Sequence, residues 1–536
     1  MREKLIVILV ILAVLGGYLS HSYLAKYLFI EDIGSSWIEK CWFLSFFMVI
    51  MGFITVLEWD VIFPDLRDYS VLSPLPIKLR TLFTSKFTSL LFFVGMFSLS
   101  TNFFSVFIFS VYLTHLKKVS FLYFFQYLIS HSISVYAANL FIFFSLVFIE
   151  GLLMSVFSYS MFKKISTYIQ TFFMAFFVSV FALLPKIHSS LSTLREKDSI
   201  FLYLFPPMWF TGLYENLLGR KNLFYSALSG ISLLAIGIPV VVFFITVSIS
   251  YRKHLKRTQE VKKGATNFLR LKIFFAGIFN KIFLRNSVQR AIFHFFGNTL
   301  IRSKTHRLHL GAYIAVALGF IFAELLPQIF QRGSEINIYV PNKTLLSIPH
   351  ILSFIIIIGL RVTITIPLSL EANWIFKLTE IQNKRDYLSG MRKGGFFYII
   401  LPLYFLLFIL YFFLWGWKYA LLHCIYGLTI SALFMEAILV NFRKIPFACS
   451  YLPGKANLKL LWPVYLLSFI SYVYFFTHLE YWLLKNQSYF LIFYPMALSL
   501  YLGIKIYRRY FIDLRFNFKY EESPEPVMVS LDLNNA

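Results

Sequence analysis

The sequence predicts an all-α, polytopic membrane protein of twelve transmembrane helices, arranged as two six-helix halves. Of the 536 residues, 59% are hydrophobic and only 14% are charged, whereas soluble domains are about 45–50% apolar and about 25% charged. Apolar runs of about 20 residues, the length that crosses a bilayer core, recur along the chain. A strongly basic segment separates these runs into two groups of six.

Each apolar run is long enough to cross the hydrocarbon as a helix, in which the backbone satisfies its own hydrogen bonds. The predicted spans are 4–20, 41–58, 87–113, 134–160, 165–184, 223–250, 309–330, 349–371, 396–414, 419–442, 460–478 and 487–507. The first run also fits a signal peptide, with two basic residues, an apolar core and then small residues. We favour an uncleaved first span, and cleavage would leave the later topology unchanged.

The distribution of Lys and Arg predicts the orientation of the spans. With the N-terminus in the cytoplasm, the cytoplasmic segments carry 36 Lys and Arg residues and the outer segments carry 13. Positive charge concentrates on the cytoplasmic side of membrane proteins, so both termini are expected there. The net charge of +25 then indicates loops that face an anionic inner leaflet, and no nucleic-acid partner is expected.

The chain divides into four predicted parts. They are a first six-span half (1–250), a basic amphipathic cytoplasmic linker (251–308), a second six-span half (309–510) and a polar cytoplasmic tail (511–536). The linker carries 14 basic residues against one acid, Glu260. Apolar residues at helical spacing over 275–282 predict a helix that lies on the inner leaflet.

A weak sequence similarity between the two halves supports an internal duplication of the chain. The second span exits through "LEWDVIF" (57–63) and soon meets "RDYSVLS" (67–73), while the eighth exits through "LEANWIF" (370–376) and meets "RDYLSG" (385–390). Both are the second spans of their halves. Matches in the same order at corresponding places favour two related halves.

A polar, basic segment broken by two prolines, "RDYSVLSPLPIKLRTLFTSK", lies between the second and third spans. Pro74 and Pro76 disfavour helix at the residues before them, which predicts a short helix, a kink and a second helix that enters the third span. These two kinked helices below the membrane would form either a solvated loop that contacts lipid phosphates or a docking element that receives force from a soluble partner.

The stretch "FPDLRDYSVLSPLPIKLRTLFTSK" (63–86) resembles the first cytoplasmic loop of ABC-2-type transporter permeases, with its Pro-Leu-Pro core and a lysine that opens the third span. The resemblance implies the membrane subunit of an ABC exporter in a fused two-half form, in the bacterial inner (plasma) membrane. Its loop would be a coupling helix on a cytosolic ABC ATPase subunit, present in two copies. The coupling residues would be Asp65, Arg67, Asp68, Tyr69, Pro74, Leu75, Pro76, Lys78, Arg80 and Lys86.

Two later cytoplasmic loops, "LEANWIFKLTE" (370–380) and "RKIPFACSYLPGKANLK" (443–459), look like loops of large fused permeases. The candidate residues in the second-half loops are Glu371, Asn373, Trp374, Glu380, Arg385, Pro453, Gly454 and Lys455. The chain has no G-x-x-x-x-G-K-[ST] sequence, so ATP and Mg²⁺ are expected on the partner ATPase. This chain is expected to bind no cofactor or metal and to catalyse no reaction.

Four ionisable residues are predicted inside spans: Glu150, Glu324, Arg361 and Glu436. Each costs roughly 2.5–3.5 kcal/mol at the bilayer centre, so such residues usually face the bundle interior. One interpretation is an ion pair between helices, with Arg361 in reach of Glu436 or Glu324, and the other is a polar lining along a substrate path. Weaker polar positions, expected to form interhelical hydrogen bonds, are His131, Asn139 and His423.

Two alternative functions remain open. An ion-gradient-driven secondary transporter would use carboxylates within spans and would contain broken helices, for which "AIGIP" (235–239) is a candidate. A polytopic enzyme acting on a lipid-linked substrate would need outer acids such as Glu31 and Asp32, but the chain has no H-E-x-x-H or G-x-S-x-G sequence. The outer stretch "FPPMWFTGLYENLLG" (205–219) is expected to form an interfacial aromatic belt.

Overall fold

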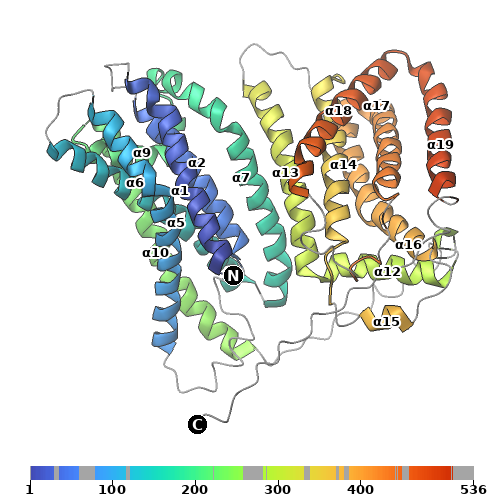
Figure 1. Ribbon diagram of the computed structural model, residues 1–536, viewed down its shortest axis with the longest axis horizontal. Helices are drawn as coiled ribbons and strands as arrows, with labels where there is room; N and C mark the ends of the chain where they lie inside the picture. The colour runs from blue at the N-terminus through green and yellow to red at the C-terminus, as the bar shows by residue number, and fades with distance from the viewer. Residues whose placement is uncertain are drawn as a thin grey trace, which may run out of the picture. The chain divides into compact units, whose positions relative to one another are not determined.

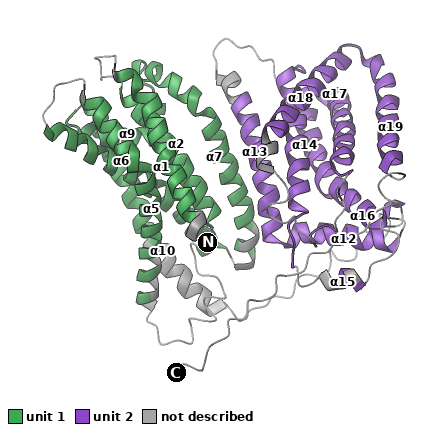
Figure 2. Ribbon diagram, in the orientation of Figure 1, with its two compact units in different colours: residues 1–262 green, residues 263–536 purple. Residues whose placement is uncertain are grey.

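The computed structural model describes most of the chain, in segments. The described residues are 2–28, 36–59, 79–115, 121–157, 159–220, 222–257, 280, 282–284, 286–330, 339–369, 373–378, 385–440, 442, 445–448, 458–508 and 510. The chain forms two compact units, residues 1–262 and 263–536 (Figure 2). The boundary between these units falls inside the predicted linker 251–308.

Unit 1 is a bundle of long helices connected by short ones (Figure 1). Its elements are α1 (Arg2–Leu24), the 3-10 helix η1 (Ala25–Leu28), α2 (Trp37–Leu57), α5 (Leu79–His115), α6 (Phe121–Val156), α7 (Tyr159–Glu196), α8 (Phe201–Leu204), α9 (Pro206–Leu217) and α10 (Leu223–Arg257). The helices α5, α6 and α7 have 37, 36 and 38 residues. At 1.5 Å per residue they are longer than the roughly 30 Å hydrocarbon core and extend beyond it.

Unit 2 combines long helices with short surface helices. Its elements are α12 (Ser287–Arg302), α13 (Lys304–Phe330), α14 (Lys343–Thr363), α15 (Asn373–Leu378), α16 (Arg385–Gly395), the π-helix η3 (Phe396–Ile400), α17 (Leu401–Ile438), α18 (Leu458–Lys485), the 3-10 helix η4 (Gln487–Tyr489) and α19 (Phe490–Tyr507). Asn342 caps α14, since its side-chain oxygen accepts a hydrogen bond from the Leu345 amide at 2.9 Å.

The predicted fold class, an all-α polytopic membrane protein, is confirmed. Among the described residues there is no strand, and ten helical segments are long and apolar enough to cross a membrane. Many large apolar side chains on these helices point outward, for example Phe92, Phe413 and Leu491. Such surfaces are stable where lipid, and not water, is the solvent.

The second apolar helix of each unit is its central helix. In both α2 and α14, 78% of the most apolar stretch is buried inside the protein, against 50% or less in the other candidate spans among the described residues. The helix α2 packs against α6, α7 and α9, and α14 packs against α13, α17 and α18. The two units therefore place helices of the same rank in the same structural role.

The helix α12 is the amphipathic helix that the structure describes within the predicted linker. Its apolar side chains Ile292, Phe293 and Phe296 are buried, while Arg290 and Arg302 are exposed. It runs crosswise to α13 and α14 at the end of unit 2 where α13 begins (Figure 1). The helix predicted over 275–282 lies almost entirely outside the described residues.

The long helix α17 is a hairpin. Gly416 has φ 76° and ψ 171°, which interrupts the helix near its middle. The Tyr404 hydroxyl lies 2.8 Å from the Ser431 hydroxyl, and the rings of Tyr411 and His423 are 4.4 Å apart. Contacts placed symmetrically about Gly416 require the chain to reverse there, as the predicted spans 396–414 and 419–442 imply.

We expect Gly416→Ala to destabilise unit 2 by about 1–3 kcal/mol, because a side chain is strained in this backbone region. Thermal unfolding of the purified protein in detergent measures the effect. Gly503→Ala is the matched control, because a Cβ at Gly503 in α19 meets open space and its backbone is helical. Equal melting temperatures for the two variants would contradict the turn at Gly416.

Candidate functional site

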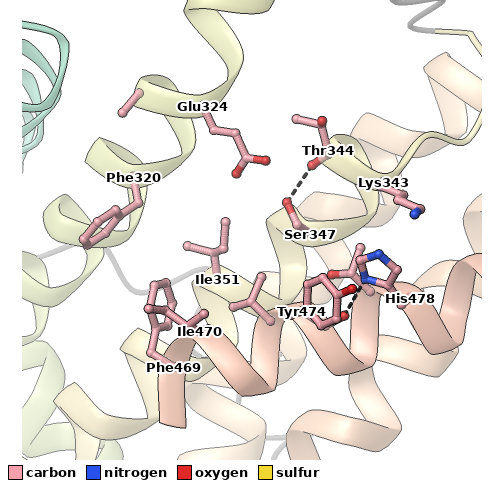
Figure 3. A pocket seen from close by; sticks show the side chains of 13 residues that line it. Phe320, Glu324, Lys343, Thr344, Ser347, Ile351, Phe469, Ile470, Tyr474 and His478 are labelled. Atoms are coloured by element: carbon pink, nitrogen blue, oxygen red, sulfur yellow. Dashed lines mark hydrogen bonds between the residues drawn. The ribbon is translucent and has the colours of Figure 1, made fainter. Parts of the chain in front are cut away.

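A pocket of about 530 Å³ lies between α13, α14 and α18 in unit 2. One part of its wall is apolar and includes Phe320, Ile351 and Phe469 (Figure 3). Another part is polar, and Glu324 extends from α13 into the space between the helices (Figure 3). The lining therefore suits a ligand that has both an apolar body and a polar group.

The polar part of the pocket comes from two helix ends. Lys343, Thr344 and Ser347 lie at the start of α14, and Thr477 and His478 lie near the end of α18. The Ser347 hydroxyl donates to the Thr344 carbonyl at 2.7 Å, and His478 Nδ1 lies 2.8 Å from the Tyr474 carbonyl (Figure 3). These bonds within each helix fix the direction of the side chains at the rim.

Thr477 gives the pocket a buried hydroxyl group that is available for a hydrogen bond to a ligand or to water. Its side chain is 4% exposed, and its hydroxyl is buried without a hydrogen-bond partner among the described residues. A buried hydroxyl without a hydrogen bond costs about 1–3 kcal/mol. A ligand or a water molecule in the pocket would remove this cost.

Behind the pocket wall, the core of unit 2 holds a carboxyl group between two histidines. Oε1 of Glu480 on α18 lies 2.5 Å from Nδ1 of His423, and its Oε2 lies 3.3 Å from Nε2 of His350 on α14. All three side chains are fully buried. The triad Glu480–His350–His423 therefore joins α14, the α17 hairpin and α18 at one point.

Aromatic side chains surround this triad. The rings of Tyr411 and Trp415 lie 4.4 and 5.3 Å from that of His423, and Tyr426 meets His350 edge-on at 5.7 Å. The Tyr411 hydroxyl donates to the Leu345 carbonyl at 2.7 Å. The aromatic shell keeps water away, so that the hydrogen bonds of the triad act in a medium of low polarity.

The triad can hold a proton or a positive charge at three titratable groups. Nδ1 of His350 and Nε2 of His423, the ring atoms that point away from Glu480, have no hydrogen-bond partner in the described part of the chain. Among the described residues, no group of three His, Cys, Asp or Glu side chains is arranged to hold a metal ion. The three titratable side chains of the triad can form hydrogen bonds and exchange protons.

The predicted coupling residues lie largely outside the described residues. Arg80 and Lys86 lie in the first part of α5, Asn373 and Trp374 lie in α15, and Arg385 opens α16. Outside the described residues are Asp65, Arg67, Asp68, Tyr69, Pro74, Leu75, Pro76, Lys78, Glu371, Glu380, Pro453, Gly454 and Lys455. Of these candidate residues, Arg385 adjoins Asp386, which contacts α12.

The four predicted intramembrane charges have different surroundings. Glu150 on α6 is buried, and Glu324 on α13 lines the pocket, with burial raising the cost of its charge. Arg361 and Glu436 each lie two residues from the end of their helices, α14 and α17. Of the two acids considered in reach of Arg361, Glu436 instead binds Arg508 and lies 3.9 Å from Nε of Arg392.

The three weaker polar positions form hydrogen bonds between helices, as predicted. Asn139 on α6 donates to the Ser98 hydroxyl on α5 at 3.0 Å. Nε2 of His131, also on α6, lies 3.1 Å from the Ser105 hydroxyl. His423 is the member of the Glu480 triad described above.

Unit 1 holds a buried ion pair that the sequence did not suggest. Nζ of Lys40 on α2 lies 2.6 Å from Oε1 of Glu215 on α9, and both side chains are fully buried. Arg220 approaches the other oxygen of Glu215 at 3.1 Å. The rings of Tyr214 and Tyr127 lie 4.5 and 5.5 Å from the Lys40 ammonium, where cation–π attraction adds to the pair.

The aromatic stretch 205–219 does not form the expected interfacial belt. It folds as α9, in which Phe210, Tyr214 and Glu215 are buried between α2, α6 and α10. Burial raises the pKa of the Tyr214 hydroxyl well above its ordinary value, so the hydroxyl stays neutral. The segment is a part of the bundle core, and Pro206 and Pro207 start its helix.

Comparison of the chain with protein-family models, with curated proteins and with solved structures finds no match.

Proposed function

We propose that this integral membrane protein is the permease subunit of an ATP-driven exporter of the ABC-2 type, moved by a separate cytosolic ATPase. One observation carries the proposal. The surface helix α16 continues through η3 into the hairpin α17 as one helical segment, Arg385–Ile438. A force applied to α16 at the membrane surface therefore reaches the hairpin without passing through a loop.

The packing of α16 on α12 supports a mechanical role for this surface. Gly390 and Gly394 of α16 allow close approach, since a Cβ at either position would lie 2.8 Å from an atom of α12. Two side chains of α12 and the segment before it, Gln289 and Asn286, donate to Asp386 at 2.7 and 2.8 Å. The two surface helices can thus move as one body.

The helix count supports the two-half architecture. Ten candidate spans lie among the described residues, one of them being the segment that includes the α17 hairpin. The hairpin supplies a second crossing, and the 28-residue α18 is long enough for another. On this count we propose twelve spans, with α2 and α14 as the central helices of their halves.

The pocket between α13, α14 and α18 is the proposed substrate path. Its apolar wall and its polar rim with Glu324, Lys343 and Thr477 fit an amphipathic substrate. It lies on unit 2, whose hairpin α17 is continuous with the surface helix. Displacement of the hairpin would change the packing of α14 and α18 through the Glu480 triad.

Reconstitution with an ATPase encoded beside the gene for this chain tests the proposal. We expect the chain alone to hydrolyse no ATP, and the ATPase to bind it and to be stimulated by it. Reversal of the charges of Arg67 and Asp68 in the coupling loop should abolish both effects, because charge complementarity guides docking. The matched control reverses Glu196 and Lys197, an exposed acid and base at the end of α7. Full activity without nucleotide, or an unaffected loop variant, would overturn the proposal.

One observation favours the secondary transporter as a second candidate. The buried triad of Glu480, His350 and His423 could bind and release a proton within unit 2. The broken helix predicted over 235–239 does not form, since α10 continues through Pro239. For the enzyme alternative, Glu31 and Asp32 lie outside the described residues.

A further inference from the structure

The pocket between α13, α14 and α18 is built in two layers. One polar side chain from each helix forms what we call the polar layer: Glu324, Ser347 and Thr477. Four residues away along each helix, and nearer its middle, lie the side chains of the apolar layer: Phe320, Ile351 and Val473. Four residues make about one helical turn, so each helix presents both layers on one face.

The acid of the polar layer faces the open space of the pocket. Glu324 extends between the helices (Figure 3), and it forms no ion pair or hydrogen bond within the described part of the chain. The basic residue of the lining, Lys343, is held elsewhere, because its ammonium lies 5.4 Å from the centre of the Tyr481 ring. The charge that the pocket offers to a ligand is therefore that of a carboxylate.

The two hydroxyl groups of the polar layer add hydrogen-bond acceptors. Ser347 donates its hydrogen to the Thr344 carbonyl at 2.7 Å, so its oxygen is left to accept. Thr477 is 4% exposed, and among the described residues its hydroxyl has no hydrogen-bond partner. A carboxylate and hydroxyl oxygens around one space suit a ligand group that combines positive charge with N–H donors.

The apolar layer suits the hydrophobic body of such a ligand. The rings of Phe320 on α13 and Phe469 on α18 have their centres 5.6 Å apart, and Ile351 of α14 lines the same wall. Aromatic faces also attract organic cations. The volume of about 530 Å³ lies in the range of pockets that take a drug-sized molecule.

We propose that this pocket takes an amphipathic organic cation, in which a protonated amine is joined to an apolar body. The ammonium donates to the Glu324 carboxylate and to the oxygens of Ser347 and Thr477, while the body lies against the apolar layer. An anionic amphiphile is disfavoured, because its charge would meet that of Glu324. Transport of the cation rests on the proposed function, whereas its binding rests on the pocket alone.

Binding of tritiated propranolol, a secondary amine with a naphthyl body, to the purified full chain in a nonionic detergent tests the proposal. Scintillation proximity counts the bound amine while unlabelled propranolol, its uncharged diol analogue or the anion naphthyloxyacetate competes. We expect the diol to need a roughly tenfold higher concentration than the amine, because it lacks the charge that strengthens the hydrogen bond to Glu324. The anion should not compete. Equal competition by the three compounds, or no saturable binding of propranolol, would overturn the proposal.

Two variants of the polar layer test which groups hold the amine. Glu324→Gln should weaken propranolol binding roughly tenfold and remove the preference for the amine over the diol. Thr477→Val should weaken binding roughly threefold without lowering the melting temperature, because the hydroxyl it removes has no partner among the described residues. Glu196→Gln is the matched control, since it makes the same change at an exposed site of unit 1 and should leave binding unchanged. Where Glu324→Gln does not fold, Thr477→Val and the order of the competitors decide.

A third variant separates a cationic ligand from an anionic one. Lys343→Gln removes a positive charge from the lining, so propranolol should bind to this variant as tightly as to the unchanged protein, or more tightly. A loss of binding as large as that in Glu324→Gln would overturn the assignment of a cation.

The binding measurement needs no ATPase, so its failure and the failure of the proposed function can be told apart. Selective amine binding by a chain that no neighbouring ATPase drives would support the cation as the ligand and overturn the proposed function. An ATPase-driven complex whose pocket shows no preference for the amine would overturn the cation and leave the proposed function standing.

Discussion

Replacing Glu215 by Gln is expected to lower the free energy of unfolding of unit 1 by about 3–5 kcal/mol, because it leaves a buried charge without its partner. Lys40 is fully buried, and its ammonium lies 2.6 Å from the Glu215 carboxylate. The tyrosine rings beside Lys40 offer only cation–π attraction, which does not replace the carboxylate. Thermal unfolding in detergent should show a fall of roughly 10 °C.

The double variant Lys40→Met/Glu215→Gln should recover much of this loss, because apolar side chains often replace a buried ion pair at little cost. Glu196→Gln is the matched control, since it makes the same chemical change at an exposed site of unit 1 and should alter stability by less than about 0.5 kcal/mol. If Glu215→Gln behaves like Glu196→Gln, Lys40 does not depend on this carboxylate.

The membrane fold could be predicted from the sequence because the thickness of the hydrocarbon core sets the length of each apolar helix. A helix must supply about 20 apolar residues to cross the hydrocarbon core, and such runs are visible in a single sequence. The two spans around Gly416 were separated for the same reason, and contacts such as that between the Tyr404 and Ser431 hydroxyls hold their helices side by side. The ends of the helices were less predictable, because polar residues continue a helix wherever other helices cover them.

The buried polar groups of both units show why most of the candidate site could not be predicted, although Glu324 and His423 were singled out from the sequence. Lys40 and Glu480 lie just beyond the predicted spans 41–58 and 460–478, and were therefore placed in loops. The helices α2 and α18 in fact include them. Their partners are far away in sequence, since Lys40 and Glu215 are separated by 175 positions and Glu480 and His350 by 130. Pairing over such distances is a property of tertiary packing and leaves no local pattern.

The partner of Glu436 could not be predicted for the same reason, because pairing in the folded protein leaves no local sequence pattern. Depth along a span suggested Arg361 as its partner, but two arginines nearer the end of unit 2, Arg508 and Arg392, approach it. Both had been counted as loop charges that set the orientation. Basic residues next to a membrane can thus orient the chain and also fold back onto its helices. Only the structure shows which residues do both.

Replacing Glu480 by Leu is expected to destabilise unit 2 by roughly 2–6 kcal/mol, because it leaves polar atoms of two buried histidines without hydrogen bonds. Among the residues that the structure describes, Glu480 lies within hydrogen-bond distance of both His350 and His423. Glu480→Gln should cost about 1 kcal/mol, since an amide can accept from one histidine and donate to the other. Thermal unfolding measures both effects, and Lys485→Leu, at the exposed end of the same helix, is the control.

The Gln variant also separates the two candidate functions, because it keeps the hydrogen bonds of the triad but removes its acid. For a permease moved by an ATPase, the triad joins α14, α17 and α18, and Glu480→Gln should retain most of the ATP-dependent activity. For a transporter driven by protons, the same variant should lose coupling to the proton gradient while its melting temperature stays near that of the unchanged protein. A folded Glu480→Gln protein without ATP-dependent activity would therefore contradict the structural role assigned to the triad.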